Sequence, residues 1–453
     1  MRRKQNYDCS ALPTRTLPAT RHGLSNPMLE ATTMQIDVFF RDVLLGVLDR
    51  DDQDHFTFTY APSVPAKHAL AIGMPMTQRE WKSRTLFPIF QVSYPEGFLE
   101  RLLEKRLGNG GMHASELDML LASGQKRIGN LRLVPHSEFP RVRPLELIDA
   151  GTDFEASCLA DLHRVAIGNL PGISGGFPKY LSSVPGQDAS SSEAHWIVKT
   201  NDADHPELTV LEFFGMEVSR HMGLPTPTTI LAPNREHLYV KRFDVLADGT
   251  ALQFEDACSL LGLPARDKYA SSIERVVHII RSIVAPEAAA RSCSNLFGQY
   301  VLASAIRNGD AHLKNFGVLY SPGSSPQLSP TYDMLTMGAY APRANDGDAL
   351  DGMALTLRGT RRWPRQTDLD SLAQFCGVSS AEKADWYERL GAAISRVSLE
   401  VENFCHYTCA ASTAKRLVRM LELWSIGCIH ISPNASSTAL KVSRGVSGSQ
   451  RAW

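Results

Sequence analysis

The sequence predicts an α+β protein, with sheets in its first half and mainly helices in its second. Two observations support this prediction. Short β-rich segments separated by polar turns follow one another between residues 34 and 60, and apolar residues at helical spacing dominate from residue 254 onward. The chain has 453 residues, which is enough for two or three domains. We therefore expect a β-rich part followed by a larger helical part.

The composition narrows the classes of protein to consider. Apolar residues make up 43% of the chain and charged residues 21%, as is typical of a soluble globular protein. The formal net charge is −1, so the whole chain gives no argument for nucleic-acid or membrane binding. The first thirty residues contain no apolar run, and no segment has the length of a membrane span. We therefore expect neither a secretory signal nor a transmembrane helix.

The eight cysteines are scattered and form no Cys-x2-Cys pair. This spacing argues against a disulfide framework and against a zinc site, and it fits a reducing compartment. We therefore expect a cytoplasmic protein. Cys405, His406 and Cys409 fall on one helical turn as possible metal ligands, but a buried helix face explains them better.

The first part of the chain is predicted to be a β-rich amino-terminal subdomain at residues 33–148. Residues 1–32, which precede it, are rich in Ser, Thr, Pro and Ala and are expected to lack fixed structure. The predicted strands are residues 35–40, 43–49, 55–60 and 130–133, and the predicted helices are residues 95–108 and 115–123. A proline-punctuated linker at residues 135–144 closes the subdomain.

The second part, residues 149–248, opens with a glycine-rich segment at residues 170–181. Glycines let backbone N–H groups approach phosphate oxygens, although such a segment taken alone is more often a turn. No Walker-type Gly-x4-Gly-Lys-Ser/Thr motif occurs, so a P-loop fold is not expected.

A lysine at the end of the next predicted strand, residues 195–200, is a candidate phosphate ligand. Lys199 follows an apolar run, where burying its charge costs free energy unless an anionic partner compensates it. A phosphate group of ATP would be such a partner. The alternative is that the side chain extends its ammonium group to solvent. Glu212, on the helix predicted at residues 207–222, either holds Lys199 in place or faces solvent. A further strand is predicted at residues 238–244.

The third part, residues 249–430, is predicted to be mainly helical. The expected helices are residues 254–261, 272–284, 296–306, 368–375, 381–398 and 413–426. Residues 431–453 are rich in Ser, Ala and Arg and are expected to be a disordered tail.

Two loops within the helical part have the composition of a phosphoryl-transfer centre. Asp310 and Asn315 are spaced as Asp-x4-Asn between a predicted helix and a predicted strand at residues 316–320, and Asp333 follows that strand. Transfer of the γ-phosphoryl group of ATP needs a carboxylate base and hard oxygen ligands for Mg²⁺, and these residue types supply both. For the first loop alone, a turn whose polar residues serve backbone geometry is the alternative.

Six motifs in order resemble those of the HipA-like serine/threonine kinases, the toxins of bacterial toxin–antitoxin pairs. The resemblance covers about residues 34–428. The motifs are Ser-Gly-Gly-Phe-Pro-Lys at 174–179, Trp-Ile-Val-Lys at 196–199, Leu-Glu-Phe at 211–213 with Met-Gly-Leu-Pro at 222–225, Lys-Arg-Phe-Asp at 241–244, Gly-Asp-Ala-His-Leu-Lys-Asn-Phe at 309–316 and Tyr-Asp at 332–333. The resemblance implies a protein-kinase-like bilobal fold, with a small β-rich lobe and a large helical lobe. The first domain, with Tyr-Pro-Glu-Gly at 94–97, resembles the family's amino-terminal subdomain.

The resemblance also implies roles for individual residues. Asp310 is implied as the catalytic base, Asn315 and Asp333 as the Mg²⁺ ligands, and His312 as a hydrogen-bonding group near the transferred phosphoryl group or as a structural histidine. The implied ATP-binding residues are Gly172, Ser174, Gly175, Gly176, Lys179, Lys199, Glu212, Val240 and Lys314.

Relatives regulate themselves by phosphorylating serines of the phosphate loop. Here Gly172 occupies the first such position, which leaves Ser174 as the autophosphorylation candidate, and Phe177 stands where the family usually has Gln. Family members phosphorylate proteins of the translation machinery, typically aminoacyl-tRNA synthetases, and bind a small helix-turn-helix antitoxin. The resemblance therefore implies a growth-arresting kinase with a HipB-like partner, which contacts DNA only through that partner.

Two other functions are compatible with parts of the sequence. Small-molecule phosphotransferases of the same broad fold share the Gly-Asp-x4-Asn loop, but the amino-terminal subdomain and the Ser-Gly-Gly segment argue against this class. An inactive kinase-like co-repressor is the other alternative. The retention of Asp310, Asn315 and Asp333 together argues against it.

Overall fold

The computed structural model describes residues 35–107, 115–122, 127–136, 179–184, 194–408 and 410–432. The predicted extension at residues 1–32 and the glycine-rich segment up to residue 178 lie outside the described residues. The same holds for residues 137–144 of the predicted linker and for the predicted tail from residue 433 onward.

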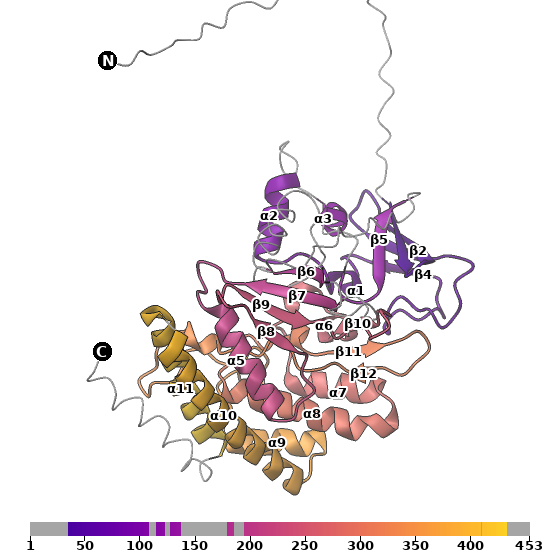
Figure 1. Ribbon diagram of the computed structural model, residues 1–453. Coiled ribbons are helices and arrows are strands. Elements are labelled where there is room, and N and C mark those ends of the chain that lie inside the picture. The colour runs from indigo at the N-terminus through magenta and orange to yellow at the C-terminus, as the bar shows by residue number, and fades with distance from the viewer. Residues whose placement is uncertain are drawn as a thin grey trace, which may run out of the picture. The chain divides into compact units, whose positions relative to one another are not determined.

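The amino-terminal part contains a five-stranded antiparallel sheet in the order β4-β3-β2-β1-β5 (Figure 1). The strands and helices of this part of the chain are β1 (Gln35–Phe40), β2 (Val43–Arg50), β3 (Phe56–Tyr60), β4 (Glu80–Ser83), α1 (Pro88–Gln91), α2 (Phe98–Leu107), α3 (Glu116–Ala122) and β5 (Leu131–Pro135). Ile36, Val38 and Phe40 alternate along β1 and are buried, as expected for a strand with one covered face. The sequence did not predict β4, because this edge strand is largely polar.

A second antiparallel sheet, in the order β6-β7-β9-β8, follows in the chain (Figure 1). Its strands are β6 (Lys179–Val184), β7 (Ala194–Thr200), β8 (Thr229–Leu231) and β9 (His237–Lys241), with α5 (Leu208–His221) between β7 and β8 in the chain. The strand register places Lys179 opposite Lys199. Like charges opposite each other on neighbouring strands repel, so this pair needs anionic partners.

One predicted helix is largely wrong. Residues 254–256, which were expected to begin a helix over residues 254–261, belong to strand β10 (Gln253–Asp256), and only α6 (Ala257–Leu260) is helical. β10 pairs with β11 (Gly317–Tyr320), which pairs with β12 (Gln327–Leu328). Every residue of β10 is buried, so the segment lacks the alternation that marks a strand in a sequence. Pairing with a strand far along the chain decided its conformation.

The other predicted helices of the carboxyl-terminal part are confirmed, with different bounds. They are α7 (Ile273–Ile283), α8 (Pro286–Ala305), α9 (Gln366–Cys376), α10 (Ser380–Thr408) and α11 (Ala411–Ile431), accompanied by short 3₁₀ turns η1 (Ala265–Asp267), η2 (Leu313–Asn315) and η3 (Met337–Ala339). Helix α8 begins earlier than predicted, at Pro286, which occupies the first helical position that proline favours. Within the described ranges, none of the helices has the length and apolar character needed to cross a membrane.

The Lys-Arg-Phe-Asp motif after β9 connects the two sheets. Asp244 is buried, and its carboxylate accepts hydrogen bonds from the backbone N–H of Gly129 at 2.7 Å and from Nε of Arg242 at 2.9 Å. Arg242 also donates to the backbone carbonyl of Arg127 at 3.0 Å. The motif therefore binds the segment before β5, in the amino-terminal part, to the segment that follows β9.

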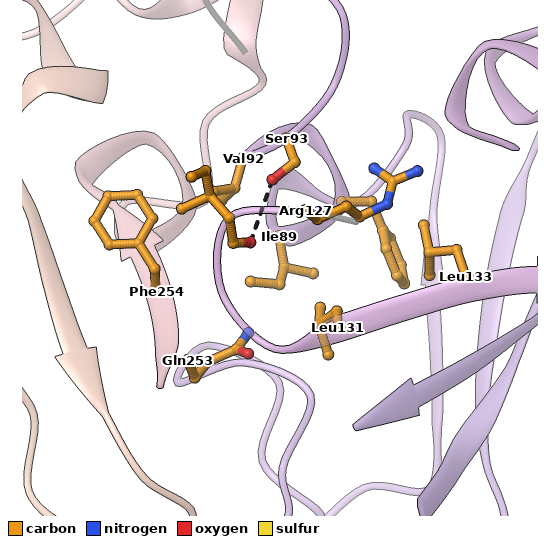
Figure 2. A pocket seen from close by; sticks show the side chains of 10 residues that line it. Ile89, Val92, Ser93, Arg127, Leu131, Leu133, Gln253 and Phe254 are labelled. Carbon is orange, nitrogen blue, oxygen red and sulfur yellow. Dashed lines mark hydrogen bonds between the residues drawn. The ribbon is translucent and has the colours of Figure 1, made fainter. Parts of the chain in front are cut away.

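A small hollow lies near this contact, among side chains of α1, β5 and β10 (Figure 2). Apolar residues such as Ile89, Leu131 and Phe254 make up most of its lining. Its volume is about 20 Å³, which is room for one water molecule and too little for a nucleotide.

Candidate active site

The loop between α8 and β11 brings three of the predicted site residues together. The side-chain oxygen of Asn315 accepts a hydrogen bond from the backbone N–H of His312 at 2.9 Å, and its amide nitrogen donates to Oδ2 of Asp333 at 3.2 Å. Asp310 lies on the same loop, with its side chain 29% exposed. The predicted base and both predicted metal ligands therefore lie around one site.

Lys199 lies between two carboxylates. Its Nζ forms ion pairs with Oε1 of Glu212 and with Oδ1 of Asp333. Burial opposes the charge on Lys199, but the two carboxylates outweigh burial and raise its pKa above the ordinary value. Burial also opposes the charge on Asp333 and would raise its pKa. Attraction to Lys199 and Lys179 outweighs burial and lowers the pKa of Asp333 to about 2. The expected contact between Lys199 and Glu212 is thus present, and Asp333 adds a second anion.

These groups line a cleft of about 110 Å³. Its wall includes nine of the predicted site residues, namely Lys179, Lys199, Glu212, Val240, Asp310, His312, Lys314, Asn315 and Asp333. Apolar side chains such as Ile197 and Leu335 also line it. Gly172, Ser174, Gly175 and Gly176 lie outside the described residues.

His312 is buried beside Asp310. Its Nε2 lies 3.9 Å from Oδ2 of Asp310, and its Nδ1 makes no hydrogen bond to any of the described residues. Burial lowers the pKa of His312 to about 4, so the imidazole is neutral at physiological pH. A neutral imidazole can donate or accept a hydrogen bond here, but it adds no positive charge to the cleft.

Lys314 connects the loop to the amino-terminal part. Its Nζ lies 3.0 Å from Oε1 of Glu96, 3.6 Å from Oδ2 of Asp256 and 2.7 Å from the carbonyl oxygen of Gln91. Glu96 also pairs with Lys268 at 2.9 Å. The role of Lys314 in ATP binding stays a prediction, while its ion pairs give it a structural task. Glu96 was not predicted as a site residue, although it lies in the Tyr-Pro-Glu-Gly motif at residues 94–97.

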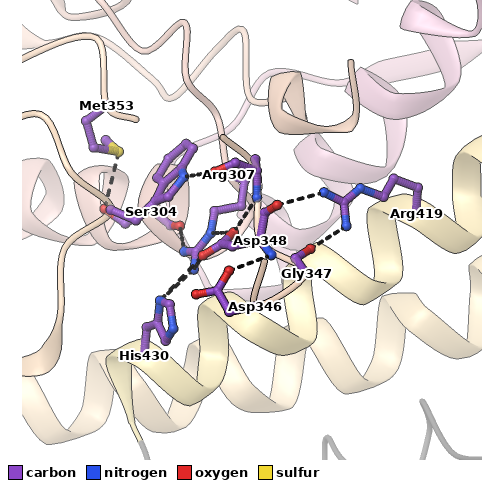
Figure 3. A network of polar contacts seen from close by, with 10 residues as sticks. Ser304, Arg307, Asp346, Gly347, Asp348, Met353, Arg419 and His430 are labelled. Carbon is purple, nitrogen blue, oxygen red and sulfur yellow. Dashed lines mark hydrogen bonds and ion pairs between the residues drawn. The ribbon is translucent and has the colours of Figure 1, made fainter. Parts of the chain in front are cut away.

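A buried arginine at the start of this loop, just after α8, lies in a network of polar contacts (Figure 3). Arg307 is fully buried, and its Nε and Nη2 donate to the two carboxylate oxygens of Asp348, each at 2.8 Å. Its guanidinium lies 4.9 Å from the ring centre of Trp363 and donates to Nδ1 of His430 at 2.8 Å. Burial lowers the pKa of His430 to about 4, so this imidazole is neutral and accepts the bond. A two-pronged arginine–carboxylate pair restricts orientation as well as position, so it fixes the start of the loop that carries Asp310.

Helix α5 packs directly against the segment that carries Asp333. A Cβ atom on Gly215 would lie 2.1 Å from the carbonyl oxygen of Met334. We expect Gly215→Ala to displace this segment, to lower the free energy of unfolding by about 1–3 kcal/mol and to weaken nucleotide binding. Chemical denaturation and a nucleotide titration measure the two effects.

Gly391→Ala is the matched control, because it also lies in a helix and its Cβ would have nothing within 4 Å. This variant should gain about 0.5–1 kcal/mol from the higher helix propensity of alanine. If both variants gained stability, the close contact of Gly215 would not constrain the Asp333 segment.

The α+β architecture and the cleft define a kinase-like protein. The chain belongs to the HipA family: residues 36–134 match the family model of the HipA N-terminal domain, and residues 172–400 match that of the HipA-like C-terminal domain. The family predicted from the ordered motifs is thereby confirmed.

Relatives and a solved structure agree with this assignment. The chain is 26% identical over 331 residues to "Putative kinase Y4dM" of Sinorhizobium fredii, covering 69% of this chain and 74% of the relative. It is 26% identical over 337 residues to "Putative kinase Y4mE" of the same organism, covering 68% and 79%. HipA of Shewanella oneidensis MR-1, solved in complex with HipB and its operator DNA, superposes with a TM-score of 0.64 at 15% identity, covering 90% of this chain and 99% of that one. This likeness confirms the predicted fold.

Proposed function

We propose that this chain is an ATP- and Mg²⁺-dependent serine/threonine-protein kinase of the HipA type. The observation that supports this most directly is the position of Lys199 between Glu212 and Asp333, in the same cleft as Asp310 and Asn315. A lysine paired with a helix glutamate, a base on a catalytic loop and an Asn–Asp pair for metal are the parts that protein kinases use.

The donor atoms in the cleft fit the proposed ligands. The Asp333 carboxylate and the Asn315 amide oxygen are hard oxygen donors of the kind that Mg²⁺ prefers. The amide oxygen of Asn315 has a second lone pair beyond the one that accepts from His312. Bound Mg²⁺ would supply neutralisation of the charge on the phosphates. In this proposal Lys199 and Lys179 bind phosphate oxygens, and Asp310 accepts the proton of the attacking hydroxyl.

The partner and the target are proposed from the family. The Shewanella relative was solved with HipB and operator DNA, which supports a HipB-like antitoxin as the partner here and DNA contact only through it. We further propose that the acceptor is a protein of the translation machinery, such as an aminoacyl-tRNA synthetase, that its phosphorylation arrests growth, and that the protein acts in the cytoplasm.

Mass spectrometry of the purified chain after incubation with ATP tests the proposed activity. The samples are the chain with Mg²⁺, the chain with EDTA, and the chain with Mg²⁺ and either casein or a panel of aminoglycosides and sugars. We expect Mg²⁺-dependent phosphate on Ser174 or on serines and threonines of casein. Phosphate on the small molecules alone would favour the phosphotransferase alternative. ATP binding without any transfer would favour the inactive co-repressor.

A further inference from the structure

A tyrosine outside the predicted site contacts the proposed catalytic base. Tyr269 lies in the short segment between η1 and α7, and its hydroxyl donates a hydrogen bond to Oδ1 of Asp310 at 2.6 Å. Its ring packs edge-on against His312, with 5.2 Å between the ring centres. Tyr269 is 37% exposed, so it lies where Asp310 meets the surface.

This contact has the geometry of the bond that catalysis requires. A general base must lie within about 2.6–3.2 Å of the hydroxyl oxygen whose proton it takes. The Tyr269 hydroxyl meets this condition at Oδ1 of Asp310. A serine or threonine hydroxyl that uses the same carboxylate oxygen therefore competes with Tyr269 for it.

The backbone around Tyr269 is held, whereas its side chain is at the surface. The carbonyl oxygen of Lys268 accepts from the backbone N–H of Leu313 at 3.0 Å, and Nζ of Lys268 pairs with Glu96. Arg361 donates to the carbonyl oxygen of Tyr269 itself. Rotation of the exposed side chain is therefore the simplest way for the hydroxyl to leave Asp310, because it breaks none of these backbone contacts.

We propose that Tyr269 is a gate on the acceptor side of the cleft: its hydroxyl holds the place on Asp310 that the serine or threonine hydroxyl of a protein substrate takes, and the substrate must displace it. This inference rests on the proposed kinase function. It implies that the acceptor reaches Asp310 from the side on which the Tyr269 side chain lies. Tyr269 is thus a specificity-determining residue, which acts by competing with the acceptor.

Tyr269→Phe removes the competing hydroxyl and keeps the ring. We expect the KM for casein to fall about tenfold, with kcat maintained and the KM for ATP unchanged, because a hydrogen bond to a charged group typically contributes at least this much. Tyr340→Phe is the matched control: the Tyr340 hydroxyl donates to the carbonyl oxygen of Pro206 at 2.8 Å and not to Asp310. Thermal unfolding of both variants checks that each is folded.

Several outcomes would overturn the gate. An unchanged KM for casein would show that the hydroxyl does not compete, and a fall in kcat would show that Tyr269 positions Asp310 instead. Asp310→Asn separates these results from failure of the proposed function. If no variant transferred phosphate above the level of Asp310→Asn, the kinase proposal itself would fail, and the gate with it.

Nitration of Tyr269 by tetranitromethane provides a readout without turnover. Burial and the Asp310 carboxylate raise the pKa of Tyr269, and nitration requires the phenolate. Nitration of Tyr269, followed by peptide mass spectrometry, should therefore be faster in Asp310→Asn than in the wild-type chain. Equal rates would show that the Asp310 carboxylate does not lie against the Tyr269 hydroxyl in solution, and the gate would be ruled out.

Discussion

Replacing Asp310 with Asn is expected to lower the rate of phosphoryl transfer by a factor of about 10²–10⁴, the usual contribution of a positioned general base. Asn keeps the shape of the side chain and can still accept the hydrogen bond from Tyr269, but it cannot take a proton at neutral pH. Because the Asp310 side chain is partly exposed, the free energy of unfolding should change by no more than about 0.5 kcal/mol. Initial rates with Mg²⁺-ATP and casein, together with denaturant unfolding, measure both quantities.

Asp385→Asn is the control for this variant. Asp385 lies on α10, is 58% exposed and forms an ion pair with Arg389 at 2.7 Å. Its replacement should leave the transfer rate unchanged. If Asp310→Asn also kept the wild-type rate, Asp310 would not be the base, and the roles assigned to the loop would have to be revised.

Replacing Lys199 with Met is expected to have the largest effect on stability and to abolish nucleotide binding. The change leaves the buried Glu212 and the partly exposed Asp333 without the cation that pairs with both. Removing one partner of a buried ion pair typically costs about 3–5 kcal/mol, because the remaining charge is no longer compensated. Denaturant unfolding and a titration with ATP measure the two losses.

The penalty of Lys199→Met should depend on pH. In the wild-type chain the pKa of Asp333 is lowered to about 2, so its contribution to stability is present above the unfolded value of about 3.9 and is lost as the pH falls towards 2. Without Lys199, burial instead favours the protonated carboxylic acids. The variant should therefore be less destabilised at pH 5 than at pH 8.

Lys383→Met is the matched control for the lysine variant. Lys383 pairs with Asp370 at 2.7 Å, but both side chains are partly exposed to solvent. Its loss should cost no more than about 1 kcal/mol at either pH. Equal penalties for the two lysines would mean that Lys199 is not the central cation of a buried site.

The local parts of the fold and of the site could be predicted from the sequence. The predicted strands β1, β2 and β3 are confirmed, and the apolar residues of β1 and β3 show the alternation expected of a sheet with one covered face. Asp310 and Asn315 share one short loop, so their spacing alone predicts that they lie near each other. Lys199 and Glu212 come from a strand and the helix that follows it, and consecutive elements usually pack together.

Contacts between distant segments could not be predicted in this way. Glu96 reaches Lys314, and Tyr269 reaches Asp310, although no periodicity or spacing connects the two members of either pair. Strand β10 was predicted as helix because its residues are buried on both faces and its partner β11 comes much later in the chain. In each case the decisive neighbour is close in space and distant in sequence.

The sequence by itself determined the family, the α+β fold and the residue types of the proposed site, because strand alternation, helical spacing and ordered motifs are recorded in consecutive residues. Only the tertiary structure decided that Asp333 shares Lys199 with Glu212, that the amino-terminal part pairs through Glu96 with the loop that carries Lys314, and that the Tyr269 hydroxyl binds Asp310. These contacts depend on how whole elements pack, and packing is a property of the assembled chain and not of any single segment.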